Sequence, residues 1–201
     1  MSAQAAFQKA NQFWSSKFKK QGAGFTARSG EDMKLQTARI EDLLLTRLTE
    51  ADHFEDGLDF GCGCGRFIEF LSNYCDHVWG ADVLAEVLEA ARAKAANVSA
   101  IHVTWPPKLP PHIDLLLGVF IFQHLIDDSL LAHVAGELRK VLSSGARVLI
   151  IDNAIDVALH VKPRGHAALA SVLGLRPDYH FELVTINNRP SDHWLIDGIK
   201  A

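Results

Sequence analysis

The chain has 201 residues, of which 48% are hydrophobic and 22% charged. This fits one globular domain with a sizeable core, because domains usually run to roughly 100–200 residues. Twenty basic against 24 acidic residues give a formal net charge of -4, which excludes a strongly basic protein that holds nucleic acid by bulk electrostatics.

The first 30 residues differ in character from the rest. Aromatic residues and lysines are mixed between Phe13 and Lys20, and glycines follow at positions 22, 24 and 30. This pattern predicts an amphipathic helix followed by a break. Two interpretations stay open for residues 1–30, a helix that caps one end of the core and a lid over a ligand site. Residues 31–201 are then a single domain.

The N-terminal segment is also informative about the cellular compartment of the protein. Its first 14 residues lack the charged-then-apolar layout of a signal peptide. No apolar run approaches the roughly 20 residues of a membrane span. Three cysteines, an odd number, argue against a disulfide framework. We therefore expect a cytoplasmic protein without membrane contact.

Helices and strands alternate after the first predicted helix. Apolar residues at helical spacing predict that helix over 32–48, and residues 105–112 are a proline-rich loop. The alternation predicts βαβ units and a parallel sheet with helices on both faces. The predicted strands are 57–60, 77–81, 99–104, 113–119 and 146–151, and the helices between them are 67–74, 84–96 and 129–142, the last of which stops at 143–145.

The last forty residues change pattern. A helix is predicted at 165–173, followed by strands at 180–186 and 194–199. The connection over 187–192 is too short for a parallel crossover, so these strands should form an antiparallel hairpin. The expected fold is α/β, a doubly wound, mostly parallel seven-stranded sheet with helices on both faces and a C-terminal antiparallel hairpin.

Three alternating glycines stand where the first strand meets a helix. Gly61, Gly63 and Gly65 follow Asp59, and we call residues 59–65 the glycine turn. Glycines let the backbone turn sharply and let a ligand approach the main chain. The helix that follows offers unpaired amides, and ligands bind at this edge of an open α/β sheet. A tight turn without a ligand is the alternative, but the spacing favours a ligand site.

The identity of the ligand follows from the spacing. The dinucleotide pattern G-x-G-x-x-G/A fails in both frames, because it would end at Arg66 or at Ile68. A P-loop would need a lysine that is missing here. The pattern D-x-G-x-G-x-G resembles that of class I S-adenosylmethionine-dependent methyltransferases, which have a Rossmann-like fold. The resemblance extends from Gly57 to the C-terminus.

The resemblance implies S-adenosyl-L-methionine as cofactor. Asp82, at the end of the second strand, would bind both ribose hydroxyls, since a carboxylate can accept two hydrogen bonds from a diol. Asp59 would orient the turn or reach the amino group of the methionine part. The cofactor-binding residues that the resemblance implies are Asp59, Gly61, Cys62, Gly63, Gly65, Asp82, Val83, Thr104, Trp105, Gly118, Val119 and Phe120. By the same resemblance, Val83 would pack on the adenine, and Gly118, Val119 and Phe120 would lie beneath the methionine and methyl end. For Thr104 and Trp105, a strand end with a packed indole remains the alternative to a place beside the adenine.

His124 is the candidate catalytic residue, a general base near the expected methyl group, with Gln123 as a comparable polar candidate. A base is needed only when the nucleophile must lose a proton, and a structural histidine that bonds within its loop is the alternative. His160, Arg164 and His166 follow the last parallel strand, in a region that often lines the substrate pocket.

Neither a metal nor a nucleic acid is expected. Cys62, Cys64 and Cys75 lack partners at the usual zinc spacing, and a metal would obstruct the glycine turn. The resemblance to amino-group methyltransferases of DNA or RNA fails, because no Asn/Asp-Pro-Pro-Tyr/Phe run follows the fourth strand. We expect methyl transfer to an oxygen or nitrogen of a small-molecule acceptor, recognised by residues 12–30, 105–112 and 153–166.

Two rival functions remain open at this point. One is a nucleotide-cofactor oxidoreductase, against which the missing dinucleotide pattern speaks. The other is a non-catalytic module that binds the cofactor or a partner protein with the same fold. The sequence makes no prediction of an oligomeric state.

Overall fold

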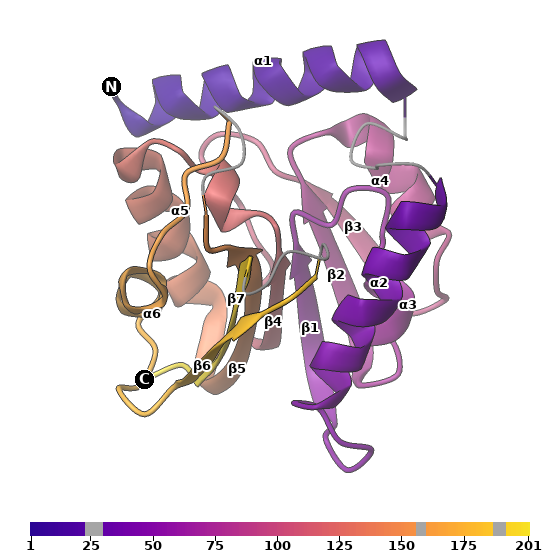
Figure 1. Ribbon diagram of the computed structural model, residues 1–201. Coiled ribbons are helices and arrows are strands. Elements are labelled where there is room, and N and C mark those ends of the chain that lie inside the picture. The colour runs from indigo at the N-terminus through magenta and orange to yellow at the C-terminus, as the bar shows by residue number, and fades with distance from the viewer. Residues whose placement is uncertain (23–29, 156–159, 187–191) are drawn as a thin grey trace.

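A computed structural model describes residues 1–22, 30–155, 160–186 and 192–201 (Figure 1). Its centre is a seven-stranded sheet in the order β3-β2-β1-β4-β5-β7-β6. The strands are β1 Phe54–Phe60, β2 Cys75–Asp82, β3 Val98–His102, β4 Ile113–Val119, β5 Leu142–Asn153, β6 His180–Val184 and β7 His193–Ile199. Pairing is parallel among β1 to β5 and antiparallel from β5 to β7 and β6. The predicted fold class is confirmed.

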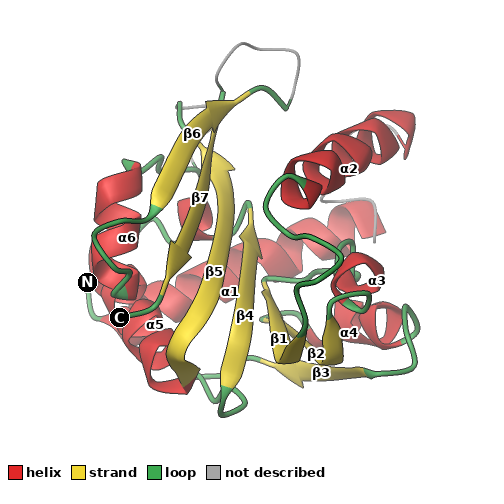
Figure 2. Cartoon of the chain, turned by 90° about the horizontal axis from the view of Figure 1, so that it is seen from below, coloured by secondary structure: helices red, strands yellow, loops and turns green. Residues whose placement is uncertain are grey.

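Helices cover both faces of the sheet (Figure 2). They are α1 Ala3–Gln21, α2 Gly30–Leu45, α3 Ile68–Leu71, α4 Ala85–Arg92, α5 Asp128–Val141 and α6 His166–Leu173, with a short 3-10 helix, η2, at Phe122–His124. One face carries α5 and α6 and the other carries α2, α3 and α4. Within the described ranges, no helix is both long and apolar enough to cross a membrane.

The core lies on both faces of the central strands. In β4, Leu116 packs toward α5 and α6, whereas its neighbours Leu115 and Leu117 pack toward α2 and α3. All three are fully buried. A strand that is covered on both faces needs apolar residues at consecutive positions, which explains the unbroken apolar run of β4.

Helix α1 lies across one end of the sheet (Figure 1). Its first turn is capped by Ser2, whose hydroxyl accepts a hydrogen bond from the Ala5 amide at 3.3 Å. Ala6 and Phe7 are buried against the face covered by α5. The N-terminal helix is therefore docked on the core through its first half.

Two local expectations are wrong. The helix predicted over 67–74 is reduced to α3, a single turn. The predicted stop at 143–145 lies inside β5, which begins directly after α5. Gly145, with a φ of 84°, and a register shift between Ile113 and Leu115 let the chain bend there without leaving the sheet.

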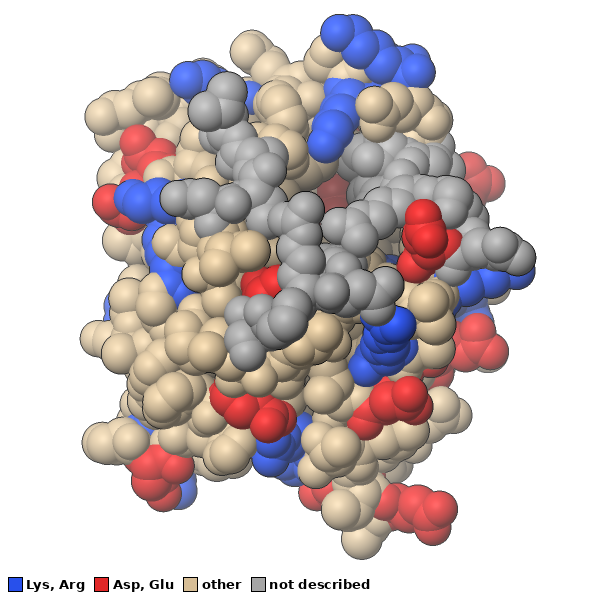
Figure 3. Space-filling model, in the orientation of Figure 1, with Lys and Arg blue, Asp and Glu red and all other residues tan. Residues whose placement is uncertain are grey.

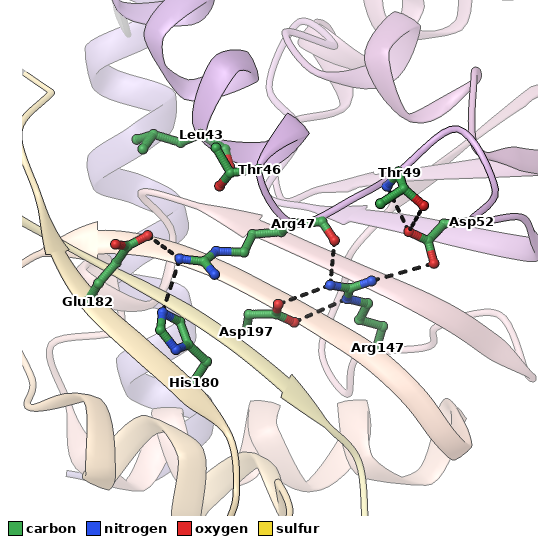
Figure 4. A network of polar contacts seen from close by, with 9 residues as sticks. All are labelled: Leu43, Thr46, Arg47, Thr49, Asp52, Arg147, His180, Glu182 and Asp197. Carbon is green, nitrogen blue, oxygen red and sulfur yellow. Dashed lines mark hydrogen bonds and ion pairs between the residues drawn. The ribbon is translucent and has the colours of Figure 1, made fainter.

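A polar network links the first half of β5 to the last part of β7 and to β6 (Figure 4). Arg147 of β5 donates two hydrogen bonds to Asp197 of β7, at 3.1 and 3.0 Å, and a third at 2.5 Å to the Arg47 carbonyl. Arg47 itself pairs with Glu182 of β6. Hydrogen bonding to Asp197 raises the pKa of Arg147. The network joins β5, β6 and β7 to the segment after α2.

Candidate functional site

A cavity of about 790 Å³ opens at the carboxyl ends of β1, β2 and β4, and α1 contributes to its wall. The order of the strands reverses beside β1, which is where open α/β sheets form ligand crevices. The volume suits a drug-sized ligand. Of the expected cofactor-binding residues and the candidate base, nine line it: Asp59, Gly61, Cys62, Gly63, Asp82, Val83, Val119, Phe120 and His124.

The three glycines of the turn all have positive φ, between 53° and 80°. A Cβ at Gly61 would lie 2.6 Å from the side chain of Ile121, and one at Gly65 would lie 2.8 Å from the Ala91 backbone. A Cβ at Gly63 would meet nothing within 4 Å. Gly61 and Gly65 are therefore required by packing, and Gly63 is the position with open space beside it. Gly65 packs on α4 and does not line the cavity.

The Asp82 carboxylate is tied to the glycine turn. One oxygen accepts a hydrogen bond from the Gly63 amide and the other from the Leu84 amide, each at 2.9 Å. Burial raises the pKa of Asp82, and these backbone hydrogen bonds oppose the rise. Each carboxylate oxygen has a second lone pair, so the group can still accept hydrogen bonds from a ligand diol.

Asp59 is buried at the end of β1, with 2% of its surface exposed. Its Oδ2 atom has no hydrogen-bond partner in the described structure. Burial, and to a lesser extent the charge of Asp82, raise the pKa of Asp59 to about 7, and the charge of Arg66 opposes this rise. An unsatisfied buried carboxyl beside a cavity costs free energy, which a ligand that donates a hydrogen bond or carries positive charge would recover.

Arg66 also lines the cavity, and its positive charge is opposite to the negative charge of an ionised Asp59. Its Nε donates to the Thr37 hydroxyl at 2.7 Å and its Nη1 to the Gln36 side chain at 3.0 Å. The buried Nη2 has no partner among the described residues. Burial lowers the pKa of Arg66 to about 10, so it stays charged at neutral pH. Arg66 was not predicted as a cavity residue, because in the sequence it stood out only as a mismatch to the dinucleotide pattern.

The residues expected at the adenine are divided. Val83 lines the cavity. Thr104 is exposed beyond the end of β3, and the Trp105 ring packs against Phe7 at 5.6 Å and His133 at 4.3 Å. Neither Thr104 nor Trp105 lines the cavity, so the geometry favours the alternative of a strand end with a packed indole.

The residues expected at the methyl end follow β4 directly. A Cβ at Gly118 would lie 2.7 Å from the Phe122 ring, so this glycine makes room for η2 and is absent from the lining. Val119 and Phe120 line the cavity. Phe120 has a φ of 57°, a conformation that is costly for a bulky residue and that recurs at functional sites.

His124 lines the cavity, with partners at both ring nitrogens. Its Nδ1 lies 3.0 Å from the His160 carbonyl, and its Nε2 lies 3.4 Å from the Gln123 amide nitrogen. The Trp14 ring packs edge-on against it at 4.7 Å. Burial lowers the pKa of His124 to about 4, so the ring is neutral at pH 7. These contacts favour the structural alternative for His124 over the role of base.

Gln123 joins η2 to the end of β5. Its side-chain oxygen accepts a hydrogen bond from the Asn153 backbone amide at 2.8 Å, and its backbone amide donates one to the Asp152 carboxylate at 3.0 Å. Of the three residues expected after the last parallel strand, His160 lines the cavity. Arg164 instead binds the Phe122 and Leu125 carbonyls, and His166 contacts Tyr179 outside the cavity.

Helix α1 supplies Trp14 and Lys17 to the cavity wall. The Lys17 ammonium lies 5.0 Å from the centre of the Trp14 ring, within the range of a cation–π contact. Phe25 and Arg28, which belong to the segment 12–30 expected to recognise the acceptor, lie outside the described residues. Helix α1 thus both packs on the core and borders the cavity, and the lid stays a prediction.

A pair that the sequence did not point to lines the cavity at the start of β7. The Nδ1 of His193 lies 2.5 Å from the Asp192 carboxylate, and both side chains are buried. The expected hairpin connection had included position 192. Because β7 runs antiparallel to its neighbour β5, its first residues lie at the edge where the parallel strands end. An Asp-His pair at the start of an antiparallel strand is the signal that would have identified it.

The surface and the cysteines add two observations. On the face shown in Figure 3, basic and acidic side chains of the described residues are interspersed, and no continuous basic tract crosses it. Within the described ranges, no group of three or more histidine, cysteine or acidic residues could hold a metal ion. Burial raises the pKa of the Cys62 thiol, which keeps it protonated beneath the turn.

Comparison with known proteins connects this geometry to a family. Residues 58–145 match the family model of a methyltransferase domain. No curated protein matches the chain. The matched range contains the glycine turn, Asp82 and the end of β4, which are the parts that form the cavity floor.

Several solved structures share the fold. Phosphoethanolamine N-methyltransferase 1 of Haemonchus contortus, in complex with phosphoethanolamine and S-adenosylhomocysteine, superposes on the whole chain with a TM-score of 0.72 and 14% identity, and the chain spans 50% of that protein. The N-methyltransferase NodS of Bradyrhizobium japonicum, in complex with S-adenosylhomocysteine, gives 0.69 and 16% identity over 95% of this chain and 98% of NodS. A SAM-dependent methyltransferase of Aquifex aeolicus gives 0.63 and 19% over 87% of this chain and 100% of that one.

Proposed function

We propose that this chain is a class I S-adenosylmethionine-dependent methyltransferase, which transfers a methyl group to an oxygen or nitrogen atom of a small-molecule acceptor. The observation that carries the proposal is the pair of unsatisfied groups in the cavity. Asp59 has a buried oxygen and Arg66 a buried nitrogen without partners among the described residues.

These two groups fit the amino-acid end of S-adenosylmethionine. Its ammonium group would meet the Asp59 carboxylate, and its carboxylate would meet the Arg66 guanidinium, so each unsatisfied group gains a charge-assisted hydrogen bond. Asp82 would hold the ribose hydroxyls, and Val83 would pack on the adenine. The open space at Gly63 leaves room for the cofactor against the main chain.

The cofactor supplies a methyl group activated by a positively charged sulfur. The protein contributes position, because in-line displacement is accelerated when the nucleophile and the methyl carbon are held at contact distance. Phe120, placed after β4, would border the methyl group. Trp14 and His124 would form the opposite wall and exclude water.

A small acceptor agrees with the charge distribution. The net charge is -4, and the described residues on the face of Figure 3 form no continuous basic tract for a phosphate backbone. The cavity must hold the cofactor and the reacting part of the acceptor together, and about 790 Å³ accommodates two small molecules.

Calorimetric titration with S-adenosylhomocysteine tests the cofactor assignment. We expect one site per chain, with an affinity that the Asp59→Asn and Arg66→Met variants each weaken by tenfold or more. Titration with NAD serves as the comparison for an oxidoreductase. Binding of NAD with no binding of S-adenosylhomocysteine at millimolar concentration would overturn the proposal.

Transfer of label from methyl-tritiated S-adenosylmethionine tests the activity. We expect labelled product when the protein is mixed with a fractionated small-metabolite extract, and none with the Asp82→Ala variant. Cofactor binding without any labelled product would instead identify the chain as a non-catalytic module.

A further inference from the structure

Building on the proposed function, we propose that His193, held by Asp192, is the general base of the site and that the acceptor is a hydroxyl compound whose proton His193 removes. The pair lines the cavity and is buried.

The position of His193 follows from the sheet. In the register of β5 and β7, His193 stands opposite Asn153, which also lines the cavity. The Phe120 ring lies 5.0 Å from the His193 ring. Phe120 follows β4, at the expected methyl end of the cofactor. The ends of β4 and β5 and the start of β7 therefore bring His193 to the place where transfer would occur.

The Asp192 carboxylate fixes the imidazole in one orientation. It lies 2.5 Å from Nδ1 of His193, and the same oxygen accepts a hydrogen bond from the Ile186 amide at 3.1 Å. The Asp192 carbonyl accepts another from the Ala154 amide at 2.9 Å. Asp192 is thus anchored to the ends of β6 and β5, and a carboxylate anchored in this way holds Nδ1 as the donor and directs the basicity of the ring to Nε2.

His124 is less suited to accept a proton. Its Nδ1 donates to a backbone carbonyl, which is neutral, whereas Nδ1 of His193 is paired with a carboxylate. A carboxylate stabilises the imidazolium ion that forms when the ring takes up a proton, and a carbonyl does so much less. Lys17 and His160 around His124 further disfavour a charged ring there.

The pairing also indicates the acceptor class. An amine attacks through its free lone pair and can lose its proton after the transfer, but a neutral hydroxyl is a poor nucleophile until its proton is removed. In the transfer, the acceptor oxygen forms a bond to the methyl carbon and the carbon–sulfur bond breaks, leaving its electron pair on sulfur. The hydroxyl proton moves to Nε2 of His193 and passes to solvent when the product leaves.

Nuclear magnetic resonance of the ¹⁵N-histidine-labelled protein with saturating S-adenosylhomocysteine tests the base assignment without an acceptor. Among the described residues, the groups packed against His193 include Asp192, which directly precedes β7, Asn153 of β5 and Phe120 after β4. The charged groups Asp59 and Arg66 also line the cavity. We expect a neutral His193 ring at pH 8 with the proton on Nδ1. A ring that stays doubly protonated up to pH 9 would overturn the proposal, because it has no site for another proton.

Variants separate this role from a structural one. Asp192→Asn and His193→Gln should leave the affinity for S-adenosylhomocysteine within threefold of the wild type, and Asp192→Asn should shift the ¹⁵N signals of His193. The matched control is Asp56→Asn, which alters the Asp56–His77 pair, 3.3 Å apart on β1 and β2. It should leave those signals unchanged. Loss of the tertiary fold in both Asp192→Asn and His193→Gln would assign the pair a structural role.

The acceptor class is tested with tritiated S-adenosylmethionine and matched probes, small alcohols and phenols beside the amines of the same carbon frame. We expect label in hydroxyl probes, with a rate that falls at least a hundredfold in His193→Gln and less than tenfold in His124→Gln. Label in amines alone, or in no hydroxyl probe, would overturn the hydroxyl assignment. Absence of S-adenosylhomocysteine binding would instead overturn the proposed function itself.

Discussion

The Asp82 carboxylate accepts a hydrogen bond from the Gly63 amide at 2.9 Å, so the acidic residue at the end of β2 and the glycine turn at the end of β1 are one structural unit. The second carboxylate oxygen binds the Leu84 amide at the start of α4. Gly63 and Asp82 are 19 positions apart in the chain. One side chain therefore shapes the turn and also presents the acceptor atoms that the ribose of the cofactor would need.

Replacing Asp82 by alanine should weaken binding of S-adenosylhomocysteine on the order of a hundredfold or more, since hydrogen bonds to a charged group contribute roughly 1.5–3 kcal/mol each. Calorimetric titration measures it. The matched control is Asp76→Ala on the same strand, an exposed residue paired with His53, which should leave the affinity unchanged. Equal affinity in the wild type and Asp82→Ala would remove the ribose assignment.

The affinity for S-adenosylhomocysteine should fall about tenfold between pH 8 and pH 6. With a pKa of about 7, the Asp59 carboxyl of the free protein is mostly ionised at pH 8 and mostly protonated at pH 6. Its proton must leave before it can pair with an ammonium group. Calorimetry in two buffers of different ionisation enthalpy should detect close to one proton released at pH 6. Asp59→Asn should bind more weakly and lose this proton release, and a pH-independent wild type would contradict the assignment.

Gly61→Ala should lower the free energy of unfolding by about 1–3 kcal/mol and weaken cofactor binding. The added Cβ would lie 2.6 Å from the Ile121 side chain, on a backbone with a φ of 80°. Gly136→Ala is the control, because nothing lies within 4 Å of its Cβ position in α5, and it should stabilise the protein by about 0.5–1 kcal/mol. Chemical denaturation measures both, and a neutral Gly61→Ala would contradict the close approach.

His124 should make the protein less stable as the pH falls from 6.5 toward 4. The unfolded chain takes up a proton on this histidine near pH 6.5, whereas in the folded protein its pKa is about 4, so the unfolded state binds more protons in that window. The loss is of order 3 kcal/mol. Denaturant titrations across the window should show a shallower pH dependence for His124→Gln, and an unchanged one for the exposed control His112→Asn. Equal slopes in wild type and His124→Gln would refute a buried neutral ring.

Asp197→Ala should cost about 2 kcal/mol or more of unfolding free energy and leave the affinity for S-adenosylhomocysteine unchanged. It leaves the guanidinium of Arg147 without the carboxylate to which it donates two hydrogen bonds (Figure 4). Neither Arg147 nor Asp197 lines the cavity. Glu137→Ala, which breaks the surface pair with Lys140, should cost under about 0.5 kcal/mol. A change in cofactor affinity in Asp197→Ala would show that this network reaches the site.

The strands and the glycine turn were predictable because the residues that determine them are neighbours in the sequence. The apolar run of β4 reflects burial on both faces, and the glycines around Gly63 reflect backbone angles that other residues adopt at a cost. The start of β5 was not predictable, since pairing with β4 and a bend at Gly145 override the local turn signal.

Neighbouring residues at characteristic spacing were enough to predict the fold class, the glycine turn and the acidic residue Asp82. Which polar groups share the cavity became clear only from the tertiary structure. It moved Trp105 under α1, enclosed His124 between its two partners, and brought Arg66 and the Asp192–His193 pair to the site. Partners far apart in the chain meet only when the sheet is assembled, and the antiparallel direction of β7 places its first residues beside the ends of the parallel strands.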